Sequence, residues 1–117
     1  LVISRSGANT IAEITAVGIP AILIPYPYAT DNHQYWNAYE LSSAGGALII
    51  KQEELEPERV TKIVSDLLMN DERLDNMKKI NRSLSKPFAA ARVVDKICQT
   101  LKEKKVKKNV FGFVRPV

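Results

Sequence analysis

Cysteine, histidine and long apolar runs are all scarce in this sequence. It has one cysteine, Cys98, among 117 residues, so it can form neither an intrachain disulfide nor a cysteine metal site. We expect Cys98 to serve in packing, as isolated thiols usually do, and we expect no metal or other cofactor. The apolar runs fall far short of the roughly 20 residues that span a bilayer, and no signal peptide or anchor is in view. These absences favour a reducing compartment such as the cytosol.

The composition that remains is that of one globular domain with a basic end. Hydrophobic residues make up 45% of the sequence and the net charge is +4, which suits a real core in a chain of this length. Aromatic residues are few and no nucleic-acid motif occurs, so we expect no nucleic-acid partner. We divide the sequence into a globular part, residues 1–101, and a basic and apolar C-terminal tail, residues 102–117. The basic excess comes mainly from Lys102, Lys104, Lys105, Lys107, Lys108 and Arg115.

Short apolar runs alternate with patterns of helical spacing. The unbroken run at 21–24 is typical of a strand buried on both faces of a parallel sheet, and we expect similar strands at 1–4 and 47–50. Since the first strand has no turn before it, we expect the sequence to be cut from something longer. Helices are expected over 7–17, ended by Gly18; around Tyr35, Ala38 and Leu41, ended by Gly45; from Pro57 to Leu68; from Leu74 to Ile80, capped by Asp71; and over 90–101.

This alternation predicts an α/β fold, part of a doubly wound parallel sheet of about three strands with flanking helices. In such sheets, ligands lie beyond the carboxyl ends of the strands. Two loops, 4–10 and 25–34, each leave the carboxyl end of a strand, and the two strands are neighbours. We therefore expect both loops to face one crevice.

The first of these loops has the features of a phosphate site. A turn at Ser6 and Gly7 leads into a helix whose first N–H groups lack partners, and the helix dipole favours an anion there. Gly7 allows close approach of a ligand, and Thr10 can add a hydroxyl donor. Glu13 cannot favour a phosphate, so we expect it to accept hydrogen bonds from hydroxyls such as those of a ribose.

Three segments of the sequence resemble a known family. They read SRSGANTIAE, GIPAILIPYPYATDNHQYWNA and AGGALII, and in this order they are similar to the C-terminal domain of the MurG family, the peptidoglycan N-acetylglucosaminyltransferases. The resemblance extends to about Leu101. It implies the C-terminal Rossmann-like domain of a two-domain GT-B fold, of which this chain would be roughly the last third.

The resemblance also implies an activity and a place in the cell. The family moves N-acetylglucosamine from UDP-N-acetylglucosamine to undecaprenyl-diphospho-N-acetylmuramoyl-pentapeptide, which converts lipid I to lipid II with inversion at the anomeric carbon. Its members work as peripheral proteins on the cytoplasmic face of the bacterial cell membrane, an anionic surface. By this resemblance the protein would be a hexosyltransferase in cell wall synthesis, while the fragment alone would be inactive.

Individual site residues follow from the same resemblance. The diphosphate would meet Ala8, Asn9 and Thr10, the ribose hydroxyls would bind Glu13, and the sugar hydroxyls would contact Gln34 with His33 beside it. The full substrate-binding set is Gly7, Ala8, Asn9, Thr10, Ile11, Ala12, Glu13, His33 and Gln34. The catalytic base and much of the uracil pocket are expected in the N-terminal domain. With no metal cluster in view, the helix dipole would stabilise charge on the departing diphosphate.

Other interpretations remain open for several of these features. His33 can simply cap the second helix or lie in solvent, and Tyr35 and Tyr39 at helical spacing favour packing. Another GT-B transferase, acting on a lipid or a small acceptor, would share the same loops. A module without catalysis could bind an anionic surface through residues 102–108 together with Val110, Phe111, Phe113 and Val114. The strand at 1–4 would leave an uncovered edge, which predicts self-association of the fragment.

Overall fold

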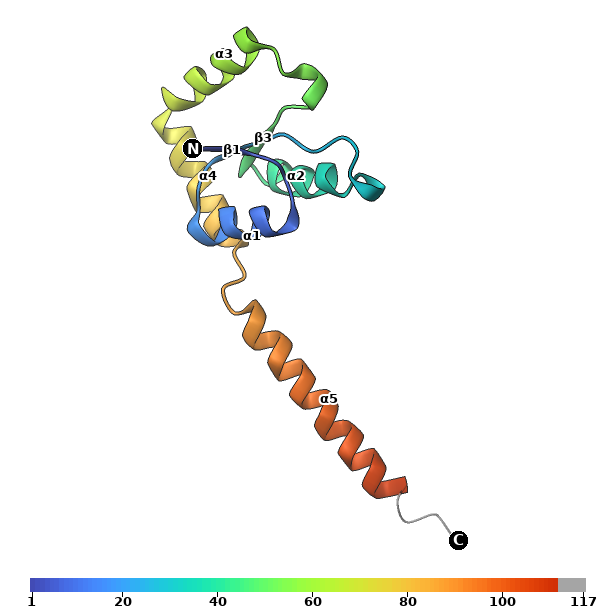
Figure 1. The fold of residues 1–117 in the computed structure, drawn as a ribbon. Helices are drawn as coiled ribbons and strands as arrows, with labels where there is room; N and C mark the ends of the chain where they lie inside the picture. The colour runs from blue at the N-terminus through green and yellow to red at the C-terminus, as the bar shows by residue number, and fades with distance from the viewer. Residues whose placement is uncertain (112–117) are drawn as a thin grey trace. The chain divides into compact units, whose positions relative to one another are not determined.

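A computed structural model describes residues 1–111 of the chain, with side chains through Lys105 (Figure 1). The chain divides into two compact units, Leu1–Lys86 and Pro87–Val117. The first unit contains the sheet and four α-helices, and the second, as far as residue 111, contains a single helix. Each unit is described by itself below.

A three-stranded parallel sheet forms the centre of the first unit. Its strands are β1 (Val2–Ser4), β2 (Ala21–Leu23) and β3 (Ala47–Ile49), in the spatial order β1-β2-β3. Ile3 lies opposite Ile22, which in turn lies opposite Leu48. The predicted strands and their parallel arrangement are confirmed, and each strand is one residue shorter than predicted. In the described residues β1 pairs only with β2, so it is an edge strand.

The helices of the first unit follow the predicted pattern with small differences at their ends. Gly18 ends the first helix with φ 74° and donates its N–H to the carbonyl of Ile14, as predicted for a left-handed cap. Two short 3₁₀ turns after β2 and β3 were not predicted. The elements are α1 (Ala8–Val17), η1 (Thr30–Asn32), α2 (His33–Ser43), η2 (Gln52–Glu54), α3 (Pro57–Leu68) and α4 (Asp71–Leu84).

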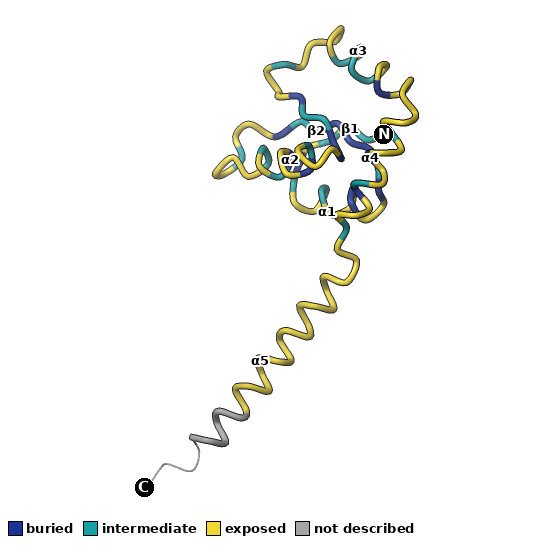
Figure 2. Tube along the Cα trace, turned by 180° about the vertical axis from the view of Figure 1, so that it is seen from behind, coloured by how far each residue is buried: buried dark blue, intermediate teal, exposed yellow. Residues whose placement is uncertain are grey.

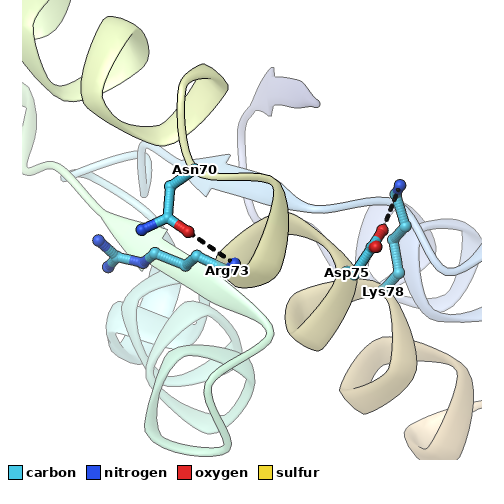
Figure 3. A network of polar contacts seen from close by, with 4 residues as sticks. All are labelled: Asn70, Arg73, Asp75 and Lys78. Atoms are coloured by element: carbon cyan, nitrogen blue, oxygen red, sulfur yellow. Dashed lines mark hydrogen bonds and ion pairs between the residues drawn. The ribbon is translucent and has the colours of Figure 1, made fainter.

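The predicted cap of α4 is wrong by one residue. Asp71 is the first residue of the helix, and Asn70 before it caps the helix by accepting the N–H of Arg73 at 2.9 Å (Figure 3). Asparagine serves this purpose as well as aspartate. Asp71 instead contributes negative charge to the first turn, where the helix dipole favours it.

The core consists of two clusters on opposite faces of the sheet. Because side chains alternate along a strand, Ala21 and Leu23 of β2 face one way and Ile22 faces the other. The first face is covered by α1 and α2 through Ile14, Ala38 and Leu41, and the second by α3 and α4 through Leu67 and Met77. Helices on both faces of a parallel sheet confirm the predicted doubly wound arrangement.

Asn81 of α4 joins the loops that enter β2 and β3. Its amide nitrogen donates to the carbonyl of Ile19 at 2.7 Å and to that of Gly46 at 2.9 Å, and its side chain is fully buried. A Cβ added to Gly46 would lie 1.8 Å from the Asn81 Oδ1 atom. Glycine is therefore required at position 46 by the side chain that packs on it.

The second unit contains α5 (Ala89–Phe111). Pro87 precedes it, as predicted, but the predicted end at Leu101 is wrong because the helix continues for ten more residues. The lysines and glutamate that follow Leu101 are good helix formers, and cations favour a helix C-terminus. The predicted boundary between residues 101 and 102 stays a prediction, as does the role of the tail.

Every residue of α5 through Lys105 is exposed (Figure 2). Cys98 is exposed too, so the prediction that it serves in packing is wrong. The side chains of Val110 and Phe111, and all of Phe113, Val114 and Arg115, lie outside the described residues. None of the described helices is both long enough and apolar enough to cross a membrane.

Candidate functional site

The N-terminus of α1 presents three backbone N–H groups without helical partners. The first hydrogen bond within the helix runs from the N–H of Ile11 to the carbonyl of Gly7, at 3.0 Å. The N–H groups of Ala8, Asn9 and Thr10 therefore precede the helical ladder, and Gly7 has no side chain to cap them. Together with the helix dipole, these groups form a seat for an anion.

Gly7 is open to its surroundings. A Cβ added there would meet no atom within 4 Å, and its φ of −64° is accessible to any residue. Neither packing nor backbone conformation therefore requires glycine at this position. Close approach of a ligand to the backbone accounts for it better.

The second predicted loop leaves β2 and leads into α2 with an unusual backbone. Asp31 and Asn32 have φ values of 52° and 53°, a left-handed conformation that costs free energy in residues other than glycine. His33 begins α2 and is exposed, and its Nδ1 lies 2.8 Å from the carbonyl oxygen of Thr30. Because a carbonyl only accepts, Nδ1 carries the proton, and a neutral ring would offer Nε2 as an acceptor.

The two loops lie together, as predicted, and Gln34 joins them. The Gln34 Oε1 atom accepts the N–H of Tyr26 at 3.0 Å and that of Ser6 at 3.3 Å. The Ser6 hydroxyl donates to the main-chain carbonyl of Gln34 at 2.7 Å, and Asn37 donates its side-chain N–H to the Ser6 carbonyl at 3.0 Å. The anion seat at α1 is thereby tied to the start of α2.

Arg5 was missed in the sequence and ties the carboxyl ends of all three strands together. Its guanidinium donates to the carbonyls of Ile24 and Pro25, both at 3.3 Å, and to the side chain of Gln52 at 2.8 Å. It also lies 5.6 Å from the centre of the Tyr26 ring. An arginine directly after an apolar strand was the available signal, but three of its four partners are loop residues that no spacing predicts.

The predicted site residues differ in what they can offer a ligand. Most of the helical stretch is exposed or half-buried, and Glu13 is exposed one turn after Thr10. Ile11 packs against the core, so only its backbone faces the site. Ser6 and Asn37 belong to the same hydrogen-bond network and were not predicted as site residues. For Asn37 the sequence contained a weak signal, because Asn37 lies one helical turn after Gln34.

A cavity of about 220 Å³ lies beside this network, at the carboxyl ends of β2 and β3. It is lined by Pro25, Pro27, Asn32, Tyr35, Lys51, Gln52 and Glu53. A larger hollow of about 460 Å³ lies along α4, around Arg73 and Asp75. We take the carboxyl ends as the candidate site because the open N–H groups at the start of α1 lie there. The α4 hollow is lined by exposed side chains, among them Asp75, which pairs with Lys78 at 2.9 Å.

The aromatic side chains of α2 pack mainly on one another. The ring of Tyr35 lies 5.5 Å from that of Trp36 and 6.3 Å from that of Tyr39, centre to centre. Tyr35 is half-buried, whereas Trp36 and Tyr39 are exposed. Tyr35 and Tyr39 therefore pack, as expected from their spacing, but on one another rather than in the core clusters. Within the described residues, no group of three metal-ligating side chains gathers to hold an ion.

Comparison with known proteins identifies the protein family of this chain. Residues 1–97 match the family described as "Glycosyltransferase family 28 C-terminal domain". Because the match covers most of the chain, the chain belongs to this family. The parallel sheet, the open N-terminus of α1 and the loop that meets it are thus features of a glycosyltransferase domain.

The individual relatives carry one enzyme name. The chain is 47% identical over 102 residues to the UDP-N-acetylglucosamine--N-acetylmuramyl-(pentapeptide) pyrophosphoryl-undecaprenol N-acetylglucosamine transferase of Halothermothrix orenii, covering 87% of this chain and 28% of the relative. The enzyme of the same name from Desulforamulus reducens is 45% identical over 94 residues, covering 80% and 25%. The chain thus spans about a quarter of the length of the curated relatives.

A solved structure agrees with the sequence relatives. The crystal structure of Acinetobacter baumannii MurG matches with a TM-score of 0.76 and 36% identity, over 83% of this chain and 29% of that one. The resemblance to the C-terminal domain of the MurG family is therefore confirmed. So is the fold that it implied.

Proposed function

We propose that this chain is the donor-binding part of an inverting glycosyltransferase. In this proposal the whole protein transfers N-acetylglucosamine from UDP-N-acetylglucosamine to undecaprenyl-diphospho-N-acetylmuramoyl-pentapeptide, in peptidoglycan synthesis. The observation that carries the proposal is the junction at Gln34, which ties an open helix N-terminus to the loop carrying His33. The names of the relatives supply the donor and the acceptor.

The chemistry at this junction follows from which groups lack partners. The N–H groups of Ala8, Asn9 and Thr10 would receive the diphosphate. Negative charge grows on the diphosphate as the bond to the sugar breaks, so preorganised donors stabilise the transition state more than the ground state. Glu13, exposed on the same helix, would accept hydrogen bonds from the ribose hydroxyls.

The sugar would lie toward the second loop, against His33 and Gln34. Both residues stand at the start of α2, and Gln34 is hydrogen-bonded to Ser6, which precedes the anion seat. The attacking hydroxyl belongs to the acceptor, and the base that takes its proton is not assigned to any residue of this chain. The mechanism thus limits the described residues to binding the donor and stabilising its leaving group.

The ribose contact gives a direct test of the proposal. Glu13→Ala should weaken binding of UDP-N-acetylglucosamine by about 1.5 to 3 kcal/mol, the scale for hydrogen bonds to a charged group. Titration calorimetry on the protein at its natural length would measure the effect. Glu40→Ala is the matched control, since Glu40 is also an exposed glutamate on a helix and should bind the donor as the wild type does. Equal affinities for the Glu13 and Glu40 variants would contradict the ribose role.

We further propose that the protein works on an anionic membrane surface and that the basic end of α5 contributes to its retention there. The apolar side chains of Val93, Val94, Ile97 and Leu101 are more than half exposed, and lysines follow them along the helix. Each cation near an anionic surface contributes about 1 kcal/mol. Replacing Lys102, Lys104 and Lys105 by Gln should reduce retention on phosphatidylglycerol vesicles at low salt and leave UDP binding intact. Equal retention would remove this part of the proposal.

Self-association of the 117-residue chain is proposed through the edge strand β1. Leu1 and Ile3 are 40% and 45% exposed, and an open strand edge can pair with another chain. Sedimentation over a range of concentrations tests this. A monomer at every concentration would contradict it.

A further inference from the structure

The oxygen and the nitrogen of the Gln34 side-chain amide have different roles. Its amide faces the N–H groups of Ser6 and Tyr26, at 3.3 and 3.0 Å. Both partners are donors, so the atom that faces them is the oxygen, and the orientation of the amide is fixed. Gln34 can then offer a ligand only its N–H₂ group. A ligand atom bound there must be an acceptor, such as the oxygen of a sugar hydroxyl.

Ser6 uses all of its polar groups on the start of α2. Its N–H and hydroxyl are donated to Gln34, and its carbonyl accepts from Asn37. The residue is fully buried, so water cannot replace these bonds. Because Gly7 and α1 follow directly, the position of Ser6 sets the position of the anion seat.

We propose that Ser6, Gln34 and Asn37 form a clamp that fixes the distance between the anion seat and the sugar-contacting loop, and that the clamp makes Gln34 a pure hydrogen-bond donor toward the sugar. Ser6 and Asn37 are positioning residues in this proposal. The identity of the ligand rests on the proposed function, whereas the clamp itself does not. Diphosphate and sugar are joined by one bond, so an error of about 1 Å in this spacing would separate one of them from its partners.

Two substitutions of Gln34 separate the clamp from the sugar contact. In Gln34→Glu, a carboxylate can still accept both backbone N–H groups, but no donor remains for the sugar. In Gln34→Met, a side chain of similar size loses both functions. Amide hydrogen exchange reports the clamp through the N–H groups of Ser6 and Tyr26. The ratio of the dissociation constants of UDP and UDP-N-acetylglucosamine reports the sugar contact. Gln34→Met adds no charge, so its ratio is free of electrostatic effects on the diphosphate. In Gln34→Glu, repulsion falls more on UDP, whose terminal phosphate carries the greater charge, and therefore opposes the expected change.

The clamp predicts a different pattern for each variant. Gln34→Glu should keep the exchange protection of both amides and change the ratio about tenfold against the sugar nucleotide. Gln34→Met should change the ratio similarly and lose the protection. Asn37→Ala should weaken binding of both nucleotides together, about fivefold or more, with the wild-type ratio. Ser6→Ala, which removes only a hydroxyl, gives a second test of positioning if Asn37→Ala does not fold.

Each result can overturn a stated part of the proposal. A wild-type ratio in the neutral variant Gln34→Met would show that Gln34 does not donate to the sugar. Full protection of Ser6 and Tyr26 in Gln34→Met would show that there is no clamp. Unchanged affinities in Asn37→Ala and Ser6→Ala would show that neither residue positions the seat. A wild-type protein that binds neither nucleotide would instead refute the proposed function, and the exchange data would still decide the clamp.

Discussion

Two side-chain amides tie together the loops of this sheet, one at each end. Gln34 accepts hydrogen bonds from residues that follow β1 and β2, at the carboxyl ends of the strands. Asn81 donates to the residues just before β2 and β3, at the amino ends. Asn81 is fully buried, whereas Gln34 is half-buried.

We interpret this difference in burial as a difference in role: the buried amide at the amino ends stabilises the fold, and the half-buried amide at the carboxyl ends lies at the candidate binding site. At the amino ends, the Asn81 side chain is closed off from solvent and its nitrogen is bound to two carbonyls, so this network serves the fold. At the carboxyl ends, the N–H groups of Ala8, Asn9 and Thr10 stay open, and a side chain at Gly7 would meet nothing. We therefore propose that the carboxyl ends of the sheet receive a ligand, whereas the amino ends serve the fold.

The largest expected effect comes from removing the buried amide. Asn81→Ala removes the side-chain donor from the buried carbonyl of Gly46 and from the half-buried carbonyl of Ile19, and a buried polar group left without a partner costs about 1 to 3 kcal/mol. We expect the free energy of unfolding to fall by about 3 kcal/mol or more in urea denaturation. Donor binding by the folded fraction should not change. Asn76→Ala is the control, because Asn76 is exposed on the same helix and should lose little.

Gly46→Ala tests the contact between Gly46 and the Asn81 side chain by changing the other partner. The new Cβ would collide with the Asn81 amide, and overpacking of this kind costs about 1 to 3 kcal/mol. In an Asn81→Ala background the same substitution should cost clearly less, since its main obstacle is gone. Equal costs in the two backgrounds would show that another contact excludes the side chain.

A smaller effect is expected in the loop that leads to α2. Asn32 has φ 53° and makes no capping hydrogen bond with its side chain. Asn32→Gly should leave the free energy of unfolding nearly unchanged, whereas Asn32→Ala should lower it by about 1 kcal/mol, because alanine is strained in this conformation. Thermal unfolding of the two variants side by side measures the difference. A loop that tolerates alanine as well as glycine would contradict the strain.

The smallest effect on stability is expected from the exposed ion pair between Asp75 and Lys78 of α4. The Lys78 ammonium donates to Asp75 at 2.9 Å (Figure 3) and lowers the pKa of that carboxyl, first through the hydrogen bond and then through its charge. A lowered folded-state pKa adds stability above the unfolded pKa, and this stability is lost as the pH falls through the folded value. Lys78→Met should raise the pKa of Asp75 in an NMR titration without a measurable change in melting temperature at pH 7. An unmoved pKa would contradict the pairing.

The sequence predicted the main features of the sheet because they depend on local patterns. Runs such as Ala21–Leu23 are apolar over a strand's length, and Gly18 and Pro57 mark helix ends by their backbone preferences. The meeting of the two loops followed from a general property of parallel sheets. These predictions needed no knowledge of which side chains touch.

The long-range hydrogen bonds could not be predicted in this way. Asn81 lies 62 residues from Ile19, and an asparagine on a helix gives no sign that it is buried. The role of Gln34 as an acceptor for two loops likewise depends on the register of α2 against β1. The continuation of α5 beyond Leu101 was missed because the lysines there were treated as a solvated tail rather than as helix formers.

The central claim, that the carboxyl ends receive the donor while the amino ends serve the fold, has a direct test. Backbone amide shifts of the protein would be followed during titration with UDP-N-acetylglucosamine. The account predicts the largest shifts from Gly7 to Glu13 and from His33 to Asn37, with little change at Ile19, Gly46 and Asn81. Largest shifts at the amino ends, or around the hollow along α4, would contradict it.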